Sequence, residues 1–240
     1  VPSSGMLCSA KELGINEDAS GLLILDNQFE VGADFRELYD LDDTVLEIDL
    51  TPNRGDCLSV VGVARDLAAI TDQTIAVREQ KPQPVEVDTA RKITIENGED
   101  CPRYLGRVIE NLNPKAETPL WMSERLRRSG IRPHGILVDI TNYILLEYGQ
   151  PMHAFDLAKI DGDLSVRRAK AGEKLALINE EKAELKEDTL VSADESKVLA
   201  LAGIMGGEES ACGDETSSIF LESAWFNPVT IAGRARNYGL

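Results

Sequence analysis

Three observations predict an α+β fold for this sequence of 240 residues. Short stretches of alternating or β-branched apolar residues, the pattern of strands, recur along the chain. Several longer segments instead place apolar residues three and four positions apart, which indicates helices. A polar, proline-rich stretch at residues 79–90 separates an earlier from a later group of elements and predicts a linker.

Short apolar stretches within the first 50 residues predict short strands. Residues 4–9 form an apolar stretch that runs into a turn, and residues 22–25 form a second one between Gly21 and Asp26. Two isolated strands are marginal on their own, so we expect residues 1–40 to be the end of a small β domain. Residues 46–50 alternate apolar and acidic side chains, which predicts a strand with one wet face.

A turn at residues 51–56 leads into a helix predicted for residues 57–70. Asp56 is well placed as its N-cap, and its apolar residues form one stripe along the helix. Arg54 and Asp56 fit a turn-stabilising pair better than a ligand site.

Beyond the linker, residues 93–95 and 104–109 predict strands. A helix is predicted over residues 119–128, with Thr118 as its N-cap and Gly130 as a left-handed C-cap.

The apolar run at residues 138–146 is too short for periodicity to decide between helix and strand. A cap at Asp139 or Thr141 and a stop at Gly149 favour a helix. The rest of the chain predicts the following elements: a strand at 165–169 with a basic outer face, short strands within 174–191 around a polar tip at 179–182, a small-residue apolar run at 198–207, a strand at 218–226 and a helix at 228–236.

The net charge of −17 is unevenly distributed. Residues 1–50 carry 2 basic and 12 acidic side chains, whereas residues 101–150 carry 7 basic and 5 acidic ones. Such an acidic protein binds nucleic acid poorly without specificity, although the arginines of the second block could meet a polyanion locally. Charge alone favours a solvated helix face for the arginines of residues 125–132.

The four cysteines lie far apart and form no C-x-x-C pair. Reduced thiols of a cytosolic protein are therefore expected, rather than a zinc site or a disulfide framework. No run of about 18 apolar residues and no signal peptide are present, so we expect a cytoplasmic protein without a membrane segment. The first residues do not suggest the start of a domain, which indicates a piece of a longer protein.

His153 is one of only two histidines and follows a rigid Gly149-Gln150-Pro151 turn. A histidine held in this way can bind a ligand, orient water or act as a base. Considered alone, it is better explained as a core histidine bonded to backbone. No H-x-x-x-H or H-E-x-x-H pattern supports a metal site.

Glu222 lies inside an apolar strand, where an unpaired carboxylate is costly to bury. Because side chains alternate along a strand, Glu222 shares a face with Phe220. If that face is inward, Glu222 points into a pocket; if it is wet, Glu222 is an ordinary surface residue. The sequence leaves both alternatives open.

The glycines of residues 203–207 let a backbone approach a ligand closely, but a tight hairpin turn explains them more simply. The motifs of phosphate loops, dinucleotide sites and serine hydrolases are absent.

Several motifs together resemble the β-subunit of bacterial phenylalanyl-tRNA synthetase, in family order and over nearly the whole chain. They are Ser4-Gly5-Met6-Leu7-Cys8-Ser9, Thr51-Pro52-Asn53-Arg54-Gly55-Asp56-Cys57-Leu58, Gly62-Val63-Ala64-Arg65-Asp66, Cys101-Pro102-Arg103-Tyr104, Val138-Asp139-Ile140-Thr141-Asn142-Tyr143, Gly149-Gln150-Pro151-Met152-His153-Ala154-Phe155-Asp156, Gly203-Ile204-Met205-Gly206-Gly207 and Leu221-Glu222-Ser223-Ala224.

The resemblance implies a mixed-sheet editing domain over residues 84–240. It implies that residues 1–40 are the tail of an inserted oligonucleotide-binding barrel and that residues 41–83 are the closing half of an α+β first domain.

The editing module of the family removes tyrosine wrongly attached to phenylalanine tRNA. The resemblance implies that Thr141, Asn142 and His153 position the attacking water and the tRNA end. It implies that Glu222, with the backbone of Gly206 and Gly207, recognises the tyrosine hydroxyl. No strong general base is evident, so the ribose hydroxyl of the substrate is expected to assist.

The resemblance further implies partners and cofactors. The partners are phenylalanine tRNA and, in the parent heterotetramer, a synthetase α-subunit. ATP and Mg²⁺ serve the synthetic site, which lies on another subunit, so this chain itself is expected to need no cofactor. The family continues past the position of Leu240 with a Thr/Ala-containing stretch that also lines the editing pocket. The alternative is a scaffold that docks tRNA or a partner subunit without chemistry.

Overall fold

The computed structural model describes residues 2–76 and 81–240, and the chain divides into two compact units, Val1–Leu46 and Glu47–Leu240. The predicted domain boundaries after residues 40 and 83 stay predictions. Residues 79 and 80 of the predicted linker lie outside the described residues, and residues 81–90 form neither helix nor strand.

The first unit contains one short helix, α1 (Phe35–Leu38), and no strand among its described residues. The side chain of Asp34 caps α1 by accepting a hydrogen bond from the backbone N–H of Arg36. The strands predicted at 4–9 and 22–25 are therefore wrong, whereas the assignment of residues 1–40 to a barrel stays a prediction. A single backbone hydrogen bond, from Leu23 N to Cys8 O, joins these segments, too little for a stable ladder.

The strand predicted at residues 46–50 is also wrong, because no described strand pairs with this segment. The predicted helix at 57–70 is confirmed in its body but begins later. A 3₁₀ turn (Gly55–Cys57) precedes α2 (Val60–Thr71), whose N-cap is Ser59, with its hydroxyl 3.0 Å from Gly62 N. Asp56 instead pairs with Arg54, the turn-stabilising arrangement that the sequence suggested.

The second unit contains a mixed five-stranded sheet, which confirms that part of the prediction. Its order is β1 (Ile93–Ile95), β4 (Leu164–Arg168), β7 (Leu190–Ala193), β8 (Val198–Leu201) and β9 (Met205–Gly206). The β1–β4 pair is parallel and the other pairs are antiparallel.

A second, antiparallel sheet places the long strand β10 at its centre. Its order is β2 (Arg103–Ile109), β10 (Ile219–Trp225) and β3 (His153–Asp156). A separate hairpin, β5 (Lys174–Ala176) with β6 (Lys182–Glu184), turns at the predicted polar tip.

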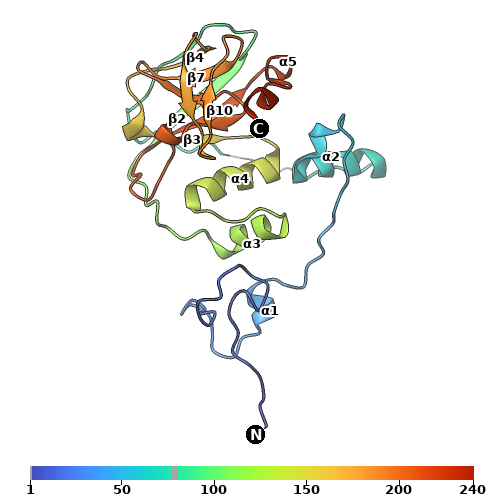
Figure 1. Cartoon of the computed structure of the whole chain (residues 1–240). Helices are drawn as coiled ribbons and strands as arrows, with labels where there is room; N and C mark the ends of the chain where they lie inside the picture. The colour runs from blue at the N-terminus through green and yellow to red at the C-terminus, as the bar shows by residue number, and fades with distance from the viewer. Residues whose placement is uncertain (1, 77–80) are drawn as a thin grey trace. The chain divides into compact units, whose positions relative to one another are not determined.

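Helix α4 (Ile136–Tyr148) packs against β3 of this second sheet, and helix α3 (Leu120–Arg128) packs against α4. In Figure 1, α4 lies between α3 and strand β3. Gly130 and Gly149 adopt the left-handed conformation expected of residues that end helices, which confirms both predicted stops. The helical interpretation of residues 138–146 is likewise confirmed.

The predicted N-caps of α3 and α4 are wrong. Pro119 and Gly135 occupy the cap positions, and neither supplies a side-chain hydrogen bond. The Thr118 hydroxyl donates to Asp139 at 2.5 Å, and Asp139 also accepts from His134 N at 2.8 Å. Asp139 therefore ties the start of α3 to that of α4, a contact between distant residues that no local pattern reveals.

The C-terminal helix is shorter than predicted. It consists of α5 (Pro228–Ile231), capped by Asn227, followed by a 3₁₀ turn over Ala235–Tyr238. Two further 3₁₀ turns cover Leu157–Lys159 and Glu208–Ser210. Within the described residues, no helix combines the length and apolar character that a bilayer crossing needs.

The main core lies where the two sheets face each other. It comprises Val108, Phe155, Leu157, Ile160, Leu164, Leu199, Ala200 and Phe220. The predicted basic outer face of β4 is wrong. Arg167 is buried and forms a two-pronged ion pair with Glu173, and Arg168 binds Asp100. Each guanidinium is thereby paired with a carboxylate of the same chain.

Candidate functional site

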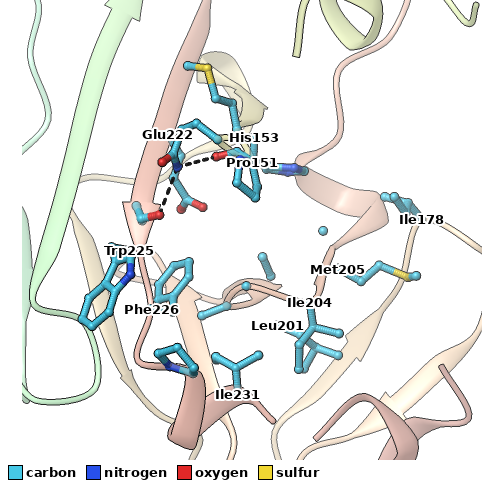
Figure 2. Close-up of a pocket in the computed structure, with 18 of the residues that line it drawn as sticks. Pro151, His153, Ile178, Leu201, Ile204, Met205, Glu222, Trp225, Phe226 and Ile231 are labelled. Atoms are coloured by element: carbon cyan, nitrogen blue, oxygen red, sulfur yellow. Dashed lines mark hydrogen bonds between the residues drawn. The ribbon is translucent and has the colours of Figure 1, made fainter. Parts of the chain in front are cut away.

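A cavity of about 560 Å³ opens beside the second sheet and contains three of the six predicted site residues: His153, Gly206 and Glu222. Its walls come from the turn before β3, the β8–β9 connection, the end of β10 and α5. Figure 2 shows Glu222, His153 and Pro151 grouped on one side of it, with Leu201, Ile204 and Ile231 across from them. A mostly apolar cavity with a few polar groups on one side has the composition of a ligand site.

Glu222 is positioned by the pairing of β10 with both of its neighbours. Its Cα lies opposite Gly106 of β2 and opposite His153 of β3. The face that Glu222 shares with Phe220 is inward, and Glu222 itself is only 8% exposed. The structure therefore decides the alternative that the sequence left open.

The Glu222 carboxylate is held by two hydroxyl groups. Tyr104 Oη and Ser192 Oγ both donate to its Oε2, the latter at 3.4 Å. Burial raises the pKa of Glu222 to about 7, and the two hydrogen bonds act against this rise. Both protonation states are consequently accessible near neutral pH.

His153 is a neutral imidazole at physiological pH, because burial lowers its pKa to about 4. Its ring meets Phe155 edge-on, with 4.4 Å between the ring centroids. The Nε2 atom is buried and has no hydrogen-bond partner among the described residues. The core-histidine explanation requires a hydrogen bond from the ring to the backbone, and Nε2 forms none with the described residues.

Gly206 lets the His153 ring approach strand β9 closely. A Cβ atom at this position would lie 2.5 Å from His153 Cε1 and 2.8 Å from Nε2, well inside contact distance. The absence of a side chain at Gly206 is thus a condition for the present position of the imidazole.

Replacing Gly206 with alanine is expected to push the imidazole out of its buried position. The His153 pKa should then rise from about 4 toward 6.5, because the ring regains water. Titration of the His153 ring protons by NMR measures this shift. Gly213→Ala is the matched control, since a Cβ there meets nothing within 4 Å. A Gly206→Ala protein with an unchanged His153 pKa would contradict the packing described above.

The other three predicted residues do not line the cavity. Gly207 packs against β8, where a Cβ would lie 2.6 Å from Leu199 O. Thr141 and Asn142 lie on α4, and the Thr141 hydroxyl donates to Val138 O within the same helix.

Sequence reasoning missed several residues that shape the site. Gln150 donates hydrogen bonds to Pro151 O and to Ala224 O, drawn in Figure 2, and so fastens the turn before β3 to β10. Tyr104 and Ser192 were likewise not predicted as site residues, although Tyr104 belongs to one of the family motifs. Strand alternation could have placed Tyr104 on an inward face, but only the pairing of distant strands brings it to Glu222.

The basic cluster of α3 is largely committed to contacts within the chain. Arg127 and Arg128 pair with the buried Glu124, while Arg125 lies over the Trp121 ring and donates to the Tyr143 hydroxyl. All four cysteines are free thiols.

Residues 100–240 match the B3/4 domain family. The chain is also similar to curated proteins named phenylalanine–tRNA ligase β-subunit: 57% identical to that of Methylococcus capsulatus, 51% to that of Acinetobacter baylyi and 52% to that of Legionella pneumophila. These matches cover 99–100% of this chain, which spans 30% of the length of each relative.

Among solved structures, the chain is similar to an N-terminal fragment of the phenylalanyl-tRNA synthetase β-subunit from Pyrococcus horikoshii. The sequence identity is 17% and the TM-score 0.46, with 75% of this chain and 55% of the other covered. The match of residues 100–240 includes both sheets of the second unit except β1, together with all the cavity-lining residues. The chain therefore belongs to the B3/4 domain family, and its resemblance to phenylalanyl-tRNA synthetase β-subunits is confirmed.

Proposed function

We propose that the cavity binds a tyrosine residue esterified to phenylalanine tRNA and that the chain hydrolyses this ester. The observation that supports this most is a buried carboxylate, Glu222, at the edge of a largely apolar cavity. The apolar walls suit an aromatic ring, and the carboxylate suits the one hydroxyl that distinguishes tyrosine from phenylalanine.

Discrimination by such a site is physically favourable. A pocket built to hydrogen-bond a substrate hydroxyl strongly rejects the analogue that lacks it, because the buried polar group is then left unpaired. Glu222 provides this group, and the backbone of Gly206 lies on the same cavity. An enzyme that synthesises the phenylalanine ester has the opposite difficulty, since an apolar pocket cannot firmly exclude an added hydroxyl.

His153 contributes a hydrogen-bond acceptor rather than a strong base. With a pKa of about 4 it is neutral, so Nε2 can orient a water molecule, but it holds a proton weakly at pH 7. The ribose hydroxyl beside the ester is therefore proposed to assist proton transfer. Thr141 and Asn142, on α4 and outside the cavity lining, are proposed to position the tRNA end.

The remaining proposals concern the whole protein and rest on the relatives. We propose a cytoplasmic phenylalanine–tRNA ligase in which a β-subunit containing this chain assembles with an α-subunit. ATP and Mg²⁺ would act at the synthetic site on the other subunit, and no residue of this chain is assigned to them.

The test is tyrosine release from mischarged phenylalanine tRNA. This chain is exchanged for the matching segment of the Methylococcus capsulatus β-subunit, and the assembled enzyme is compared with its Glu222→Ala variant. We expect the preference for tyrosyl over phenylalanyl ester to fall roughly 100-fold, as the loss of a hydrogen bond to a charged group predicts. Glu209→Ala, an exposed carboxylate, is the control. Equal release by parent and Glu222→Ala enzymes would remove Glu222 from this role.

The alternative function, a scaffold that docks tRNA without hydrolysing the ester, predicts a different result with the same exchanged-segment enzyme. Filter binding of the tRNA, titrated against salt, would then show retention while no tyrosine is released from either ester.

A further inference from the structure

We propose that Tyr104 and Ser192 are positioning residues for substrate discrimination: they fasten one oxygen of the Glu222 carboxylate so that the other reads the ligand hydroxyl. This deepens the proposed function and rests on it. The sequence motifs and the family resemblance assign no such role to either residue.

Tyr104 reaches Glu222 through the register of the central strand pair. Glu222 lies opposite Gly106, and Tyr104, two residues before Gly106, lies opposite Ala224. Tyr104 and Glu222 are therefore diagonal neighbours on the same face of the sheet, within reach for a long side chain. The phenol donates its hydroxyl hydrogen to Glu222 Oε2.

Ser192 approaches the same oxygen from the other sheet. It lies in β7, is 1% exposed, and donates to Glu222 Oε2 at 3.4 Å. The carboxylate is thus held at one oxygen by hydroxyls from β2 and from the facing sheet. Two donors from different elements restrict both the rotation of the carboxylate plane and the displacement of the side chain.

The other carboxylate oxygen, Oε1, is available to bind a ligand in the cavity. Oε1 accepts no hydrogen bond from any described residue, because both hydroxyl donors bind Oε2. Glu222 also lines the cavity. Oε1 is therefore the atom that a ligand hydroxyl would meet.

The two hydroxyls also favour the form of Glu222 that accepts a hydrogen bond. Burial disfavours the carboxylate, whereas donors to it lower the pKa of Glu222 toward its usual range. A Glu222 deprived of these donors would be protonated at higher pH and would be free to turn.

The experiment uses Tyr104→Phe, which keeps the ring packing and removes only the hydroxyl, and Ser192→Ala. Tyr143→Phe is the matched control, because that phenol binds Arg125 on the helix pair and lies outside the cavity lining. In the exchanged-segment enzyme, kcat/KM is measured for the tyrosyl and phenylalanyl esters from pH 6 to pH 8.5. In the chain itself, the Glu222 pKa is measured by carbon-13 NMR.

Tyr104→Phe is expected to lower the tyrosyl preference at least tenfold, with the phenylalanyl rate unchanged. It should also raise the Glu222 pKa above about 7 and move the pH profile of discrimination upward with it. Ser192→Ala should act in the same direction but more weakly, because its hydrogen bond is longer. Tyr143→Phe should change neither quantity.

Two results would overturn the inference. One leaves the proposed function intact, and the other removes it as well. A parent enzyme that prefers tyrosyl ester, with a Tyr104→Phe variant of equal preference, would remove only the positioning role, whether or not the Glu222 pKa moved. A parent without any tyrosyl preference would remove the proposed function and this inference together.

Discussion

Replacing Gly106 with alanine is expected to lower the free energy of unfolding by about 3 kcal/mol, the upper range for overpacking a core. A Cβ at Gly106 would lie 2.1 Å from Phe220 Cζ and 3.1 Å from Ile93 Cδ1. Phe220 is 1% exposed and packs between the two sheets, so its ring cannot move into solvent without loss of buried apolar area. Urea denaturation measures the loss.

Two further variants make this test specific. Gly98→Ala is the control, because a Cβ there meets nothing within 4 Å, and its effect should stay within about 0.5 kcal/mol. In Gly106→Ala combined with Phe220→Leu, the two losses should be less than additive, since the smaller side chain makes room for the new methyl group. Strict additivity of these two substitutions would show that the Gly106–Phe220 contact is not the cause.

His153 and Glu222 are expected to contribute opposite pH dependences to stability. The pKa of His153 falls from 6.5 to about 4 on folding, so its contribution is complete above pH 6.5 and is lost as the pH falls toward 4. The pKa of Glu222 rises from 4.5 to about 7, so its contribution is complete below pH 4.5 and is lost as the pH rises toward 7. Between pH 4.5 and 6.5 the two slopes cancel.

Single substitutions should reveal each slope separately. Relative to the parent, His153→Gln should lose about 3 kcal/mol of stability between pH 4.5 and 6.5, and Glu222→Gln should gain about the same amount, at about 1.4 kcal/mol per pH unit for each group. Urea denaturation at pH 4.5, 5.5 and 6.5 measures these differences. Glu181→Gln, at the exposed hairpin tip, should run parallel to the parent. Parallel curves for all three variants would refute the two shifted pKa values.

The sequence predicted most of the elements of residues 93–240, because their signals are local. Gly130 and Gly149 end their helices in the left-handed conformation. This helix stop depends only on the glycine itself and its immediate neighbours in the chain. The polar tip at residues 179–182 and the strand around Glu222 follow from turn residues and from alternation. The resemblance to phenylalanyl-tRNA synthetase β-subunits was also available from contiguous motifs alone.

The predictions that failed depended on partners elsewhere in the chain. Apolar segments at residues 4–9 and 22–25 have strand composition, but a strand exists only when a neighbour pairs with it. Asp139 could cap α4 by its position in the sequence, yet it receives hydrogen bonds from Thr118 and His134 instead. The sequence predicted Arg167 on an outer face of its strand, but the structure buries it against Glu173.

The candidate site shows the same contrast between local sequence signals and contacts between distant residues. The sequence by itself singled out His153, Gly206 and Glu222 as unusual residues, and the tertiary structure decided that they line one cavity and that Thr141, Asn142 and Gly207 do not. It also decided that Glu222 faces inward and that Tyr104, 118 residues away, holds its carboxylate. Helix and turn signals act over a few residues, whereas burial and strand pairing join residues far apart in the chain, so only the folded chain can specify them.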